Sequence, residues 1–110
     1  MNPAKLCGLL GMCRRSGRLV TGFDAVVALK GERGALLMTA ADASQRTVKE
    51  LLFRADAVPV YRLPLSKDEV ARAIGSQKPV AVLATADEGF AKALLPLSTL
   101  ISKEESHYDD

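Results

Sequence analysis

Helical segments alternate with short, uninterrupted apolar runs along this chain, and this alternation limits its fold more than any other feature. The apolar runs cover residues 35–40 (ALLMTA), 58–63 (VPVYRL) and 80–84 (VAVLA). Strands show such unbroken runs when helices cover both faces of their sheet, so that every side chain is buried. The sequence therefore predicts a three-layer α/β/α sandwich around a mostly parallel sheet of about four strands.

The first two helices are marked by start and stop residues. Asn2-Pro3 is a typical helix start, and Gly17 is expected to end that helix. Its apolar residues recur at helical spacing: Leu6, Leu9, Leu10 and Cys13. Residues 19–20 add a short extended piece, after which Thr21 is expected to cap a second helix over residues 22–31.

Three further helices are expected after the apolar runs, each with a polar residue at its start. They are a helix over residues 43–56 capped by Asp42 and Ser44, a helix that begins with the capping box Ser66–Glu69 and ends at Gly75, and a helix from Asp87 to Pro96. Each follows an apolar run directly, which supports the alternation of strands and helices.

Length and charge predict one domain with a distinct tail. A chain of 110 residues is long enough for one hydrophobic core and too short for two. The chain has 15 basic and 13 acidic residues, and residues 101–110 hold one of the basic and four of the acidic ones. Residues 1–100 therefore carry 14 basic and 9 acidic residues. We expect a single α/β domain over residues 1–100, with a basic surface that suits a polyanion, and an acidic, disordered tail over residues 101–110.

Several classes of protein are disfavoured by the sequence. No apolar run approaches the ~20 residues of a membrane helix, and the N-terminal charges are not arranged as in a signal peptide, so a cytoplasmic protein without a membrane partner is expected. Cys7 and Cys13 match no zinc pattern and are expected to be buried or half-buried structural thiols. His107 lies in the tail, without neighbours that would orient it for catalysis. Phosphate-loop and dinucleotide fingerprints are absent, so no cofactor is predicted.

One enzymatic alternative rests on two aspartates. Asp42 and Asp87 each follow an apolar run and open a helix. Because ligands of open α/β sheets bind beyond the carboxyl ends of the strands, the two carboxylates could hold Mg²⁺ for chemistry on a phosphate. Aspartate is also a common helix cap, which explains both residues without a metal. We predict a protein that is not an enzyme and has no metal site, and keep the magnesium-dependent enzyme as an alternative.

An arginine-rich stretch links the first helix to the second. Arg14, Arg15 and Arg18 surround a turn at Gly17, and the second helix begins shortly afterwards. A helix N-terminus offers unpaired N–H groups and the positive end of the helix dipole, both of which attract phosphate. The stretch therefore indicates contacts with a nucleic-acid backbone. The alternative is that the arginines only stabilise the C-terminal end of the first helix.

The start of the second helix adds four candidate residues. Gly22 would let another backbone approach closely, and Phe23 in the first turn could stack on a base. In the alternative interpretation, Thr21 and Asp24 cap the helix and Phe23 belongs to the core. The residues alone leave both interpretations open.

The order and spacing of six short motifs suggest a family. These motifs are GRLVTG at 17–22, ADAS at 41–44, VPV at 58–60, SKDE at 66–69, IG at 74–75 and DEGF at 87–90. In this order the chain resembles, over about residues 4–97, the bacterial YlxQ-like branch of the kink-turn-binding ribosomal protein superfamily, the L-seven-Ae and L-thirty-e type. The resemblance implies an α/β/α sandwich with a roughly four-stranded mixed sheet.

The resemblance also implies an RNA-binding site. Members of the superfamily place the N-terminus of the second helix against a sharply bent RNA, and a loop before the last strand covers an extruded base. By this resemblance, the first surface consists of Gly17, Arg18, Thr21, Gly22, Phe23 and Asp24. The second surface is the loop at residues 75–79 (GSQKP), with Gly75 and Lys78.

The matching stretch departs from the pattern of archaeal members, which carry G-T-N-E and a lysine three residues further on. Here residues 21–24 read TGFD, with Phe23 in place of the asparagine, Asp24 in place of the glutamate and Val27 in place of the lysine. Stacking and phosphate contacts are compatible with these changes. Recognition of the G·A pairs of a kink-turn is not supported by them.

The sequence thus predicts a non-catalytic, ribosomal-protein-like RNA-binding protein. Its expected partner is structured RNA, either a kink-turn or ribosomal RNA, within a ribonucleoprotein of translation, with the ribosome as one candidate location and no DNA partner. The alternative is a protein-interaction module on the same fold, in which an exposed Phe23 would be a binding hot spot.

Overall fold

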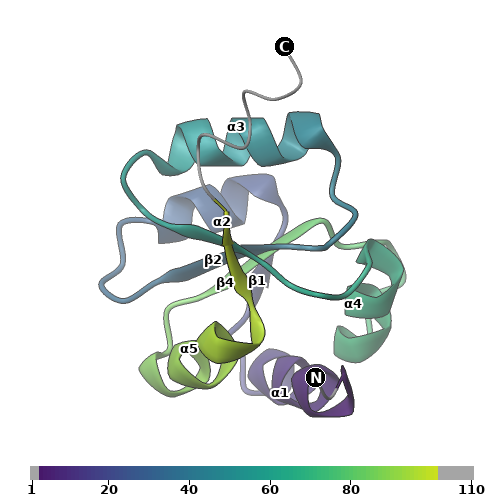
Figure 1. Ribbon diagram of the computed structural model, residues 1–110. Coiled ribbons are helices and arrows are strands. Elements are labelled where there is room, and N and C mark those ends of the chain that lie inside the picture. The colour runs from purple at the N-terminus through teal and green to yellow at the C-terminus, as the bar shows by residue number, and fades with distance from the viewer. Residues whose placement is uncertain (1–2, 102–110) are drawn as a thin grey trace.

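The computed structural model describes residues 3–101 and has the three layers that the sequence predicts (Figure 1). Two helices cover one face of the sheet: α2 (Phe23–Leu29) and α3 (Gln45–Ala55). Three helices cover the other face: α1 (Pro3–Arg15), α4 (Lys67–Ile74) and α5 (Glu88–Leu94), the last followed by the 3₁₀ turn η1 (Leu95–Leu97). The predicted α/β/α sandwich is therefore confirmed. Within residues 3–101, no helix is long and apolar enough to cross a membrane.

In the described part of the chain, one five-stranded sheet separates the helical layers, with the strand order β1-β4-β2-β3-β5. The strands are β1 (Val20–Thr21), β2 (Leu36–Thr39), β3 (Val60–Arg62), β4 (Val82–Thr85) and β5 (Thr99–Ile101). β2 and β3 are parallel, whereas the pairs β1–β4, β2–β4 and β3–β5 are antiparallel. The predicted mixed sheet is confirmed, but the expectations of four strands and of a mostly parallel sheet are wrong.

Both errors have a physical reason. A continuous apolar run indicates a strand buried on both faces, but it says nothing about the direction of that strand relative to its neighbours. The short strand β5 was missed because two of its three residues, Thr99 and Leu100, are exposed, so no buried run marks it. Ile101 was placed in the tail by the sequence and is instead the buried end of β5. The predictions for Asn2 as the cap of the first helix and for residues 102–110, including His107, lie outside the described residues.

Two hydrophobic cores lie on the two faces of the sheet. Successive residues of β2 alternate between them: Leu36 and Met38 pack toward α1, α4 and α5, while Leu37 packs toward α2 and α3. Every residue of β2 and β4 is buried. The unbroken apolar runs in the sequence follow from this arrangement, because a strand between two cores has no solvent-facing side.

The predicted caps explain where most helices begin. Ser66 accepts a hydrogen bond from the Glu69 N–H, while the Glu69 carboxylate accepts one from the Ser66 N–H, which completes the predicted capping box of α4. Ser44 caps α3 by accepting from the Thr47 N–H at 3.1 Å. Asp87 caps α5 by accepting from the Phe90 N–H at 2.9 Å. These polar side chains fix the points at which the chain leaves the sheet.

Asp42 has a different role from the one expected. Its carboxylate accepts a hydrogen bond of 2.7 Å from the Lys67 N–H at the start of α4, rather than capping α3. The Ala41 N–H also donates to the Leu65 carbonyl at 2.7 Å. These two bonds join the exit of β2 to the start of α4.

Helices α1 and α4 approach each other closely at Gly11, which is buried in α1. A Cβ atom at this position would lie 3.0 Å from the Ala73 carbonyl oxygen and 3.1 Å from an Arg15 guanidinium nitrogen. The flexible Arg15 side chain can move, but the helical carbonyl cannot move freely. The absence of a side chain at Gly11 therefore sets the separation of the two helices.

Replacing Gly11 by alanine is expected to destabilise the protein, even though alanine favours helices. The gain in helix propensity, about 1 kcal/mol, is opposed by the contact with the Ala73 backbone. Gly8 is the matched control, because it lies in the same helix with open space around its Cβ position. Chemical denaturation should give a lower unfolding free energy for Gly11→Ala and a higher one for Gly8→Ala. Equal gains for both would contradict the close packing.

Candidate nucleic-acid interface

The first candidate surface is the corner between β1 and α2. The predicted cap Thr21 belongs to β1, and Gly22 is the residue before the first turn of α2, with no side-chain cap. The first helical hydrogen bond runs from the Val26 N–H to the Gly22 carbonyl. The N–H groups of residues 23–25 therefore have no acceptor within the helix. The expected open helix start is present, but it is formed by a glycine instead of a capping threonine.

The position of Gly22 requires a backbone conformation that favours glycine. Its φ of 93° and ψ of 149° lie in a region that residues with a Cβ rarely adopt. Its N–H donates to the Val82 carbonyl at 3.2 Å, which ties the corner to the first residue of β4. The conformation turns the chain from β1 into α2 at that point.

The second candidate surface is the loop at residues 75–79. Gly75 ends α4 in the left-handed conformation, with φ 75° and ψ 25°. The Ser76 hydroxyl then donates to the Lys78 carbonyl at 2.9 Å and accepts from the Lys78 N–H at 3.2 Å. The Lys78 side chain is left exposed on this compact turn.

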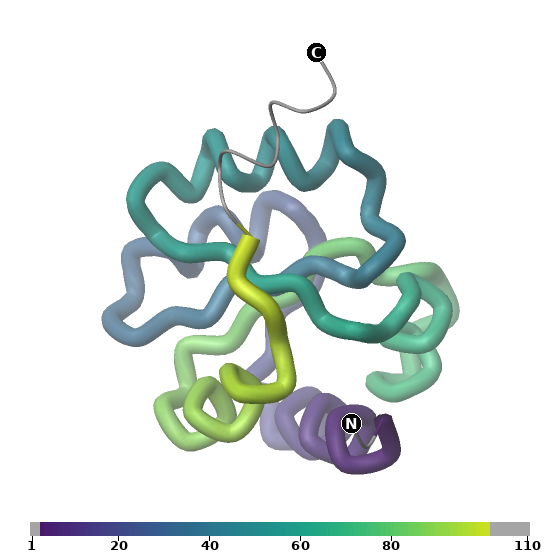
Figure 2. The backbone as a smooth tube through the Cα atoms, in the orientation of Figure 1, coloured from purple at the N-terminus to yellow at the C-terminus, as the bar shows by residue number. Residues whose placement is uncertain are grey.

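The two surfaces lie at the same end of β4. The loop at residues 75–79 leads into this strand, and Gly22 bonds to its first residue. The same end carries the start of α4, because the Val80 N–H donates to the Lys67 carbonyl. In Figure 2 the chain near residues 40–44 and 75–80 passes on the α4 side of the molecule. These segments are far apart in the sequence, and the pairing of the strands in the sheet brings them together.

The predicted arginines do not join this end of the molecule. Since β1 runs antiparallel to β4, Arg18 lies toward the other end of β4, where it pairs with Asp87 at 3.0 Å. Arg14 and Arg15 are in the last turn of α1, on the opposite face of the sheet from α2. Thus the structure places the three arginines and the start of α2 on different parts of the surface.

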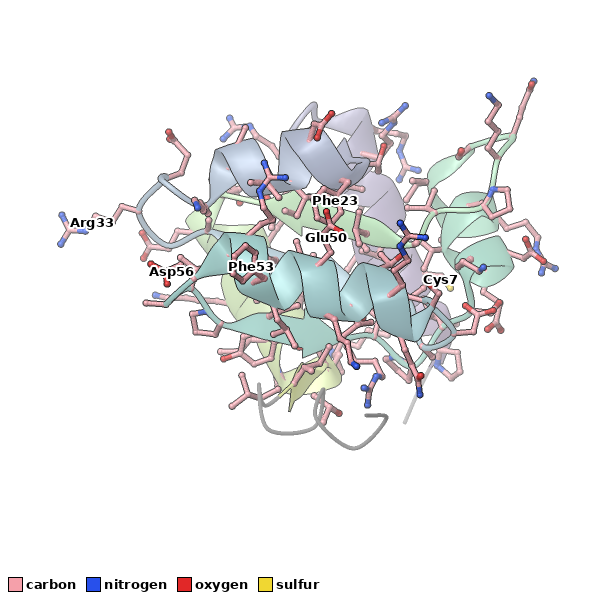
Figure 3. All side chains as sticks on the ribbon, turned by 90° about the horizontal axis from the view of Figure 1, so that it is seen from above. Cys7, Phe23, Arg33, Glu50, Phe53 and Asp56 are labelled. Carbon is pink, nitrogen blue, oxygen red and sulfur yellow. The ribbon has the colours of Figure 1, made fainter. Side chains whose placement is uncertain are left out.

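Phe23 lies at the edge of the core between α2 and α3. The ring, labelled in Figure 3, is half-buried and packs against this core. The Arg54 guanidinium lies 5.7 Å from the centroid of this ring. This agrees with the structural alternative and removes the basis for Phe23 as an exposed hot spot. Asp24 is exposed in the first turn of α2, and Val27 is buried in the core.

The structure separates the two aspartates of the magnesium hypothesis. β2 and β4 are antiparallel, with Thr39 opposite Val82 and Leu36 opposite Thr85. Asp42 follows β2 and Asp87 follows β4, so they lie at opposite ends of this strand pair. Both carboxylates accept hydrogen bonds from backbone N–H groups, and residues 3–101 contain no cluster of metal-ligating side chains. The proposed shared magnesium site is therefore wrong.

The cysteines are buried to the extent predicted. Cys13 is buried and Cys7 is half-buried, and neither forms a disulfide. Burial raises the pKa of the Cys13 thiol, and the neighbouring Asp87 carboxylate acts in the same direction, while a hydrogen bond with Thr85 opposes them. Cys13 is therefore a protonated core side chain at neutral pH.

Comparison with known proteins places the chain in a family. It is 34% identical over 94 residues to RNA-binding protein YlxQ of Enterococcus faecium, a match that covers 83% of this chain and 88% of that protein. The chain belongs to the YlxQ family. RNA-binding protein YlxQ of Bacillus subtilis (strain 168) is also 34% identical over 94 residues, covering 81% of this chain and 90% of that protein. No protein-family profile matches the chain.

A solved structure supports the same architecture for this YlxQ-family chain. It is described as a protein with unknown function from Bacillus halodurans C, and it shares 31% sequence identity with a TM-score of 0.73. The match covers 86% of this chain and 96% of that one. The resemblance to the YlxQ-like branch, which the six motifs indicate, is confirmed by the two YlxQ relatives.

Sequence reasoning missed the outer surface of α3. Phe53 is 81% exposed there, and a hollow beside it is lined by Arg46, Lys49, Glu50 and Arg54 among others. A signal for this surface existed in the sequence. Phe53 lies outside the inner stripe of α3, which was expected to consist of Val48, Leu51, Leu52 and Ala55, so an exposed aromatic side chain could have been inferred.

The strained corner of this YlxQ-family chain can be tested through stability. Gly22→Ala is expected to lower the unfolding free energy by about 1–3 kcal/mol, because alanine resists this backbone conformation even though the space around it is open. Gly31→Ala is the matched control, since that glycine also has open space but lacks a positive φ. Thermal denaturation of both variants measures the difference. Identical midpoints would argue against a strained conformation at Gly22.

Proposed function

We propose that this protein is a non-catalytic RNA-binding protein that recognises kinked, structured RNA. RNA binding is supported by the two relatives named RNA-binding protein YlxQ, each 34% identical over 94 residues. The site is supported by one feature of the fold: the uncapped start of α2 and the loop at residues 75–79 lie at the same end of β4. A kink-turn or a bent segment of ribosomal RNA, within a ribonucleoprotein of translation, is the proposed partner.

The proposed mechanism is docking of a phosphate backbone without base-specific hydrogen bonds from α2. The N–H groups of residues 23–25 point along the axis at the positive end of the helix dipole, which favours phosphate oxygens. Gly22 carries no side chain that would keep an RNA strand away. Lys78 adds a cation from the neighbouring loop. Val27 stands where archaeal relatives carry a lysine, and its burial removes it from any contact with RNA.

Direct contact with the docked RNA is not expected from Gly17 and Thr21, and is expected only conditionally from the three arginines. Thr21 and Gly17 shape the chain before the helix, with Gly17 at a φ of 75°. Arg14 and Arg15 would contact RNA only if it extends past the end of α1. Arg18 would first have to exchange its ion pair with Asp87 for a phosphate. The three arginines would therefore contribute less readily to RNA binding than Gly22 and Lys78.

Titration with a kink-turn RNA and a straight duplex at two salt concentrations tests the function. The affinity should fall with salt at a log–log slope of roughly −0.7 to −0.9 per phosphate neutralised. Lys78→Ala should weaken binding and reduce the magnitude of that slope by about 1. Lys92→Ala is the matched control, because Lys92 is an exposed lysine paired with Glu88 on α5, away from the start of β4.

The possible outcomes distinguish a failure of RNA binding from a wrong location of the RNA-binding surface. If neither RNA binds at low salt, RNA binding itself is refuted. Equal binding of duplex and kink-turn would leave RNA binding but remove the preference for a kink. Equal effects of Lys78→Ala and Lys92→Ala would place the interface elsewhere on the molecule.

Releasing Arg18 tests whether it contributes. Asp87→Ser keeps a side chain that can cap α5 but removes the carboxylate that holds Arg18. If Arg18 reaches phosphate, Asp87→Ser should raise the RNA affinity severalfold, and Arg18→Ala should lower it. Fluorescence anisotropy with the same kink-turn RNA measures both. Wild-type affinity in both variants would exclude Arg18 from the interface.

A further inference from the structure

The outer surface of α3 carries an aromatic side chain that the fold does not use. Phe53 is 81% exposed, whereas the other exposed large apolar side chains of the described chain are 43–55% exposed. The apolar residues that attach α3 to the sheet are on its opposite side: Leu51, Leu52 and Ala55. A single exposed aromatic residue is not unusual by itself. Its surroundings are what indicate a ligand.

Basic side chains accompany Phe53 along one stripe of α3. Arg46, Lys49 and Glu50 lie seven, four and three residues before Phe53, which are spacings that place them on the same side of a helix. Together with Arg54 they line a shallow hollow of about 630 Å³. Figure 3, which looks onto α3, shows Phe53 on this helix and Glu50 on the side of α3 that faces Phe23 of α2. The helix contains three basic residues and one acidic residue.

Arg54 contacts α2 through both its side chain and its backbone. Its guanidinium lies 5.7 Å from the centroid of the Phe23 ring, and its backbone carbonyl accepts a hydrogen bond of 2.6 Å from the Lys30 ammonium group. The end of α3 is thereby tied to both ends of α2. A cation positioned in this way loses less conformational freedom when it contacts a phosphate.

The stripe is continuous with the proposed RNA-binding corner. A smaller hollow of about 150 Å³ is lined by Phe23, Arg46, Thr47 and Glu50. Arg46 and Glu50 border both hollows, so the two hollows adjoin, one lined by Phe23 in the first turn of α2 and the other by Phe53. A chain that docks at Gly22 can follow this surface over α3.

We propose that the α3 stripe, meaning Arg46, Lys49, Phe53 and Arg54, binds a single-stranded extension of the docked RNA. An unpaired base stacks on the Phe53 ring, and the arginines contact the adjoining phosphates. Stacking on an exposed aromatic ring tolerates any base, because every base has a π face. The excess of basic residues favours a polyanion over a second copy of the chain, which would bring like charges together. This inference rests on the proposed function and extends it to unpaired RNA.

The test compares a kink-turn RNA with and without a uridine-rich single-stranded extension. The extension should increase the affinity of the wild-type protein, and Phe53→Ala should lose roughly tenfold on the extended RNA, as expected for one stacked base. The same variant should bind the RNA without extension like the wild type. Phe53→Tyr keeps the aromatic ring and should retain the gain. Leu100→Ala, which removes an exposed apolar side chain on β5, is the control for nonspecific loss of apolar surface.

The outcomes distinguish this inference from the proposed function. If the wild-type protein binds neither RNA, the proposed function fails and the α3 stripe fails with it. If it binds both RNAs equally, and Phe53→Ala behaves like the wild type on both, only the α3 stripe is refuted. Sedimentation of the wild type and Phe53→Ala adds a further check. A wild-type dimer that the substitution dissociates would assign Phe53 to self-association and overturn the inference.

Discussion

The antiparallel pairing of β4 with β1 and β2 is the constraint on which the candidate interface depends. β4 lies between these two strands, and all of its residues are buried. Its pairing with β1 brings Gly22 beside Val82, while its own start receives the loop at residues 75–79. Two segments far apart in the sequence thereby form one surface. A change in the register of β4 by one residue would turn its side chains to the other core and separate these segments.

Much of the fold could be predicted from the sequence because its signals are local. The capping box Ser66–Glu69 and the stop at Gly75 define α4 by hydrogen bonds within a few residues, and the structure contains both. The apolar runs locate β2 and β4 because every residue of these strands is buried between the two helical layers. The run at residues 58–63 also locates β3, in which Val60 is buried and Tyr61 and Arg62 are half-buried. Strand direction and the short edge strand β5 could not be predicted, since they depend on contacts with distant strands and leave no periodic pattern.

The candidate site was predicted only in part, for a related reason. The motifs located the corner at Gly22 and the loop with Lys78, because glycine marks unusual backbone conformations in both. The partners of the side chains were not predictable. Arg18 pairs with Asp87, 69 positions along the chain, and Phe23 is covered by Arg54 from another helix. Such pairings arise from tertiary packing, so a stretch that looks like one cationic cluster in the sequence is divided over several surfaces.

The brevity of the outer strand β1 has a consequence for how this protein can associate. β1 has two residues and forms one edge of the sheet, beside β4. An edge of that length offers few free backbone groups, so another polypeptide gains little by adding a strand to it. The core, which is rich in aliphatic residues, is thereby protected on that side from edge-to-edge aggregation.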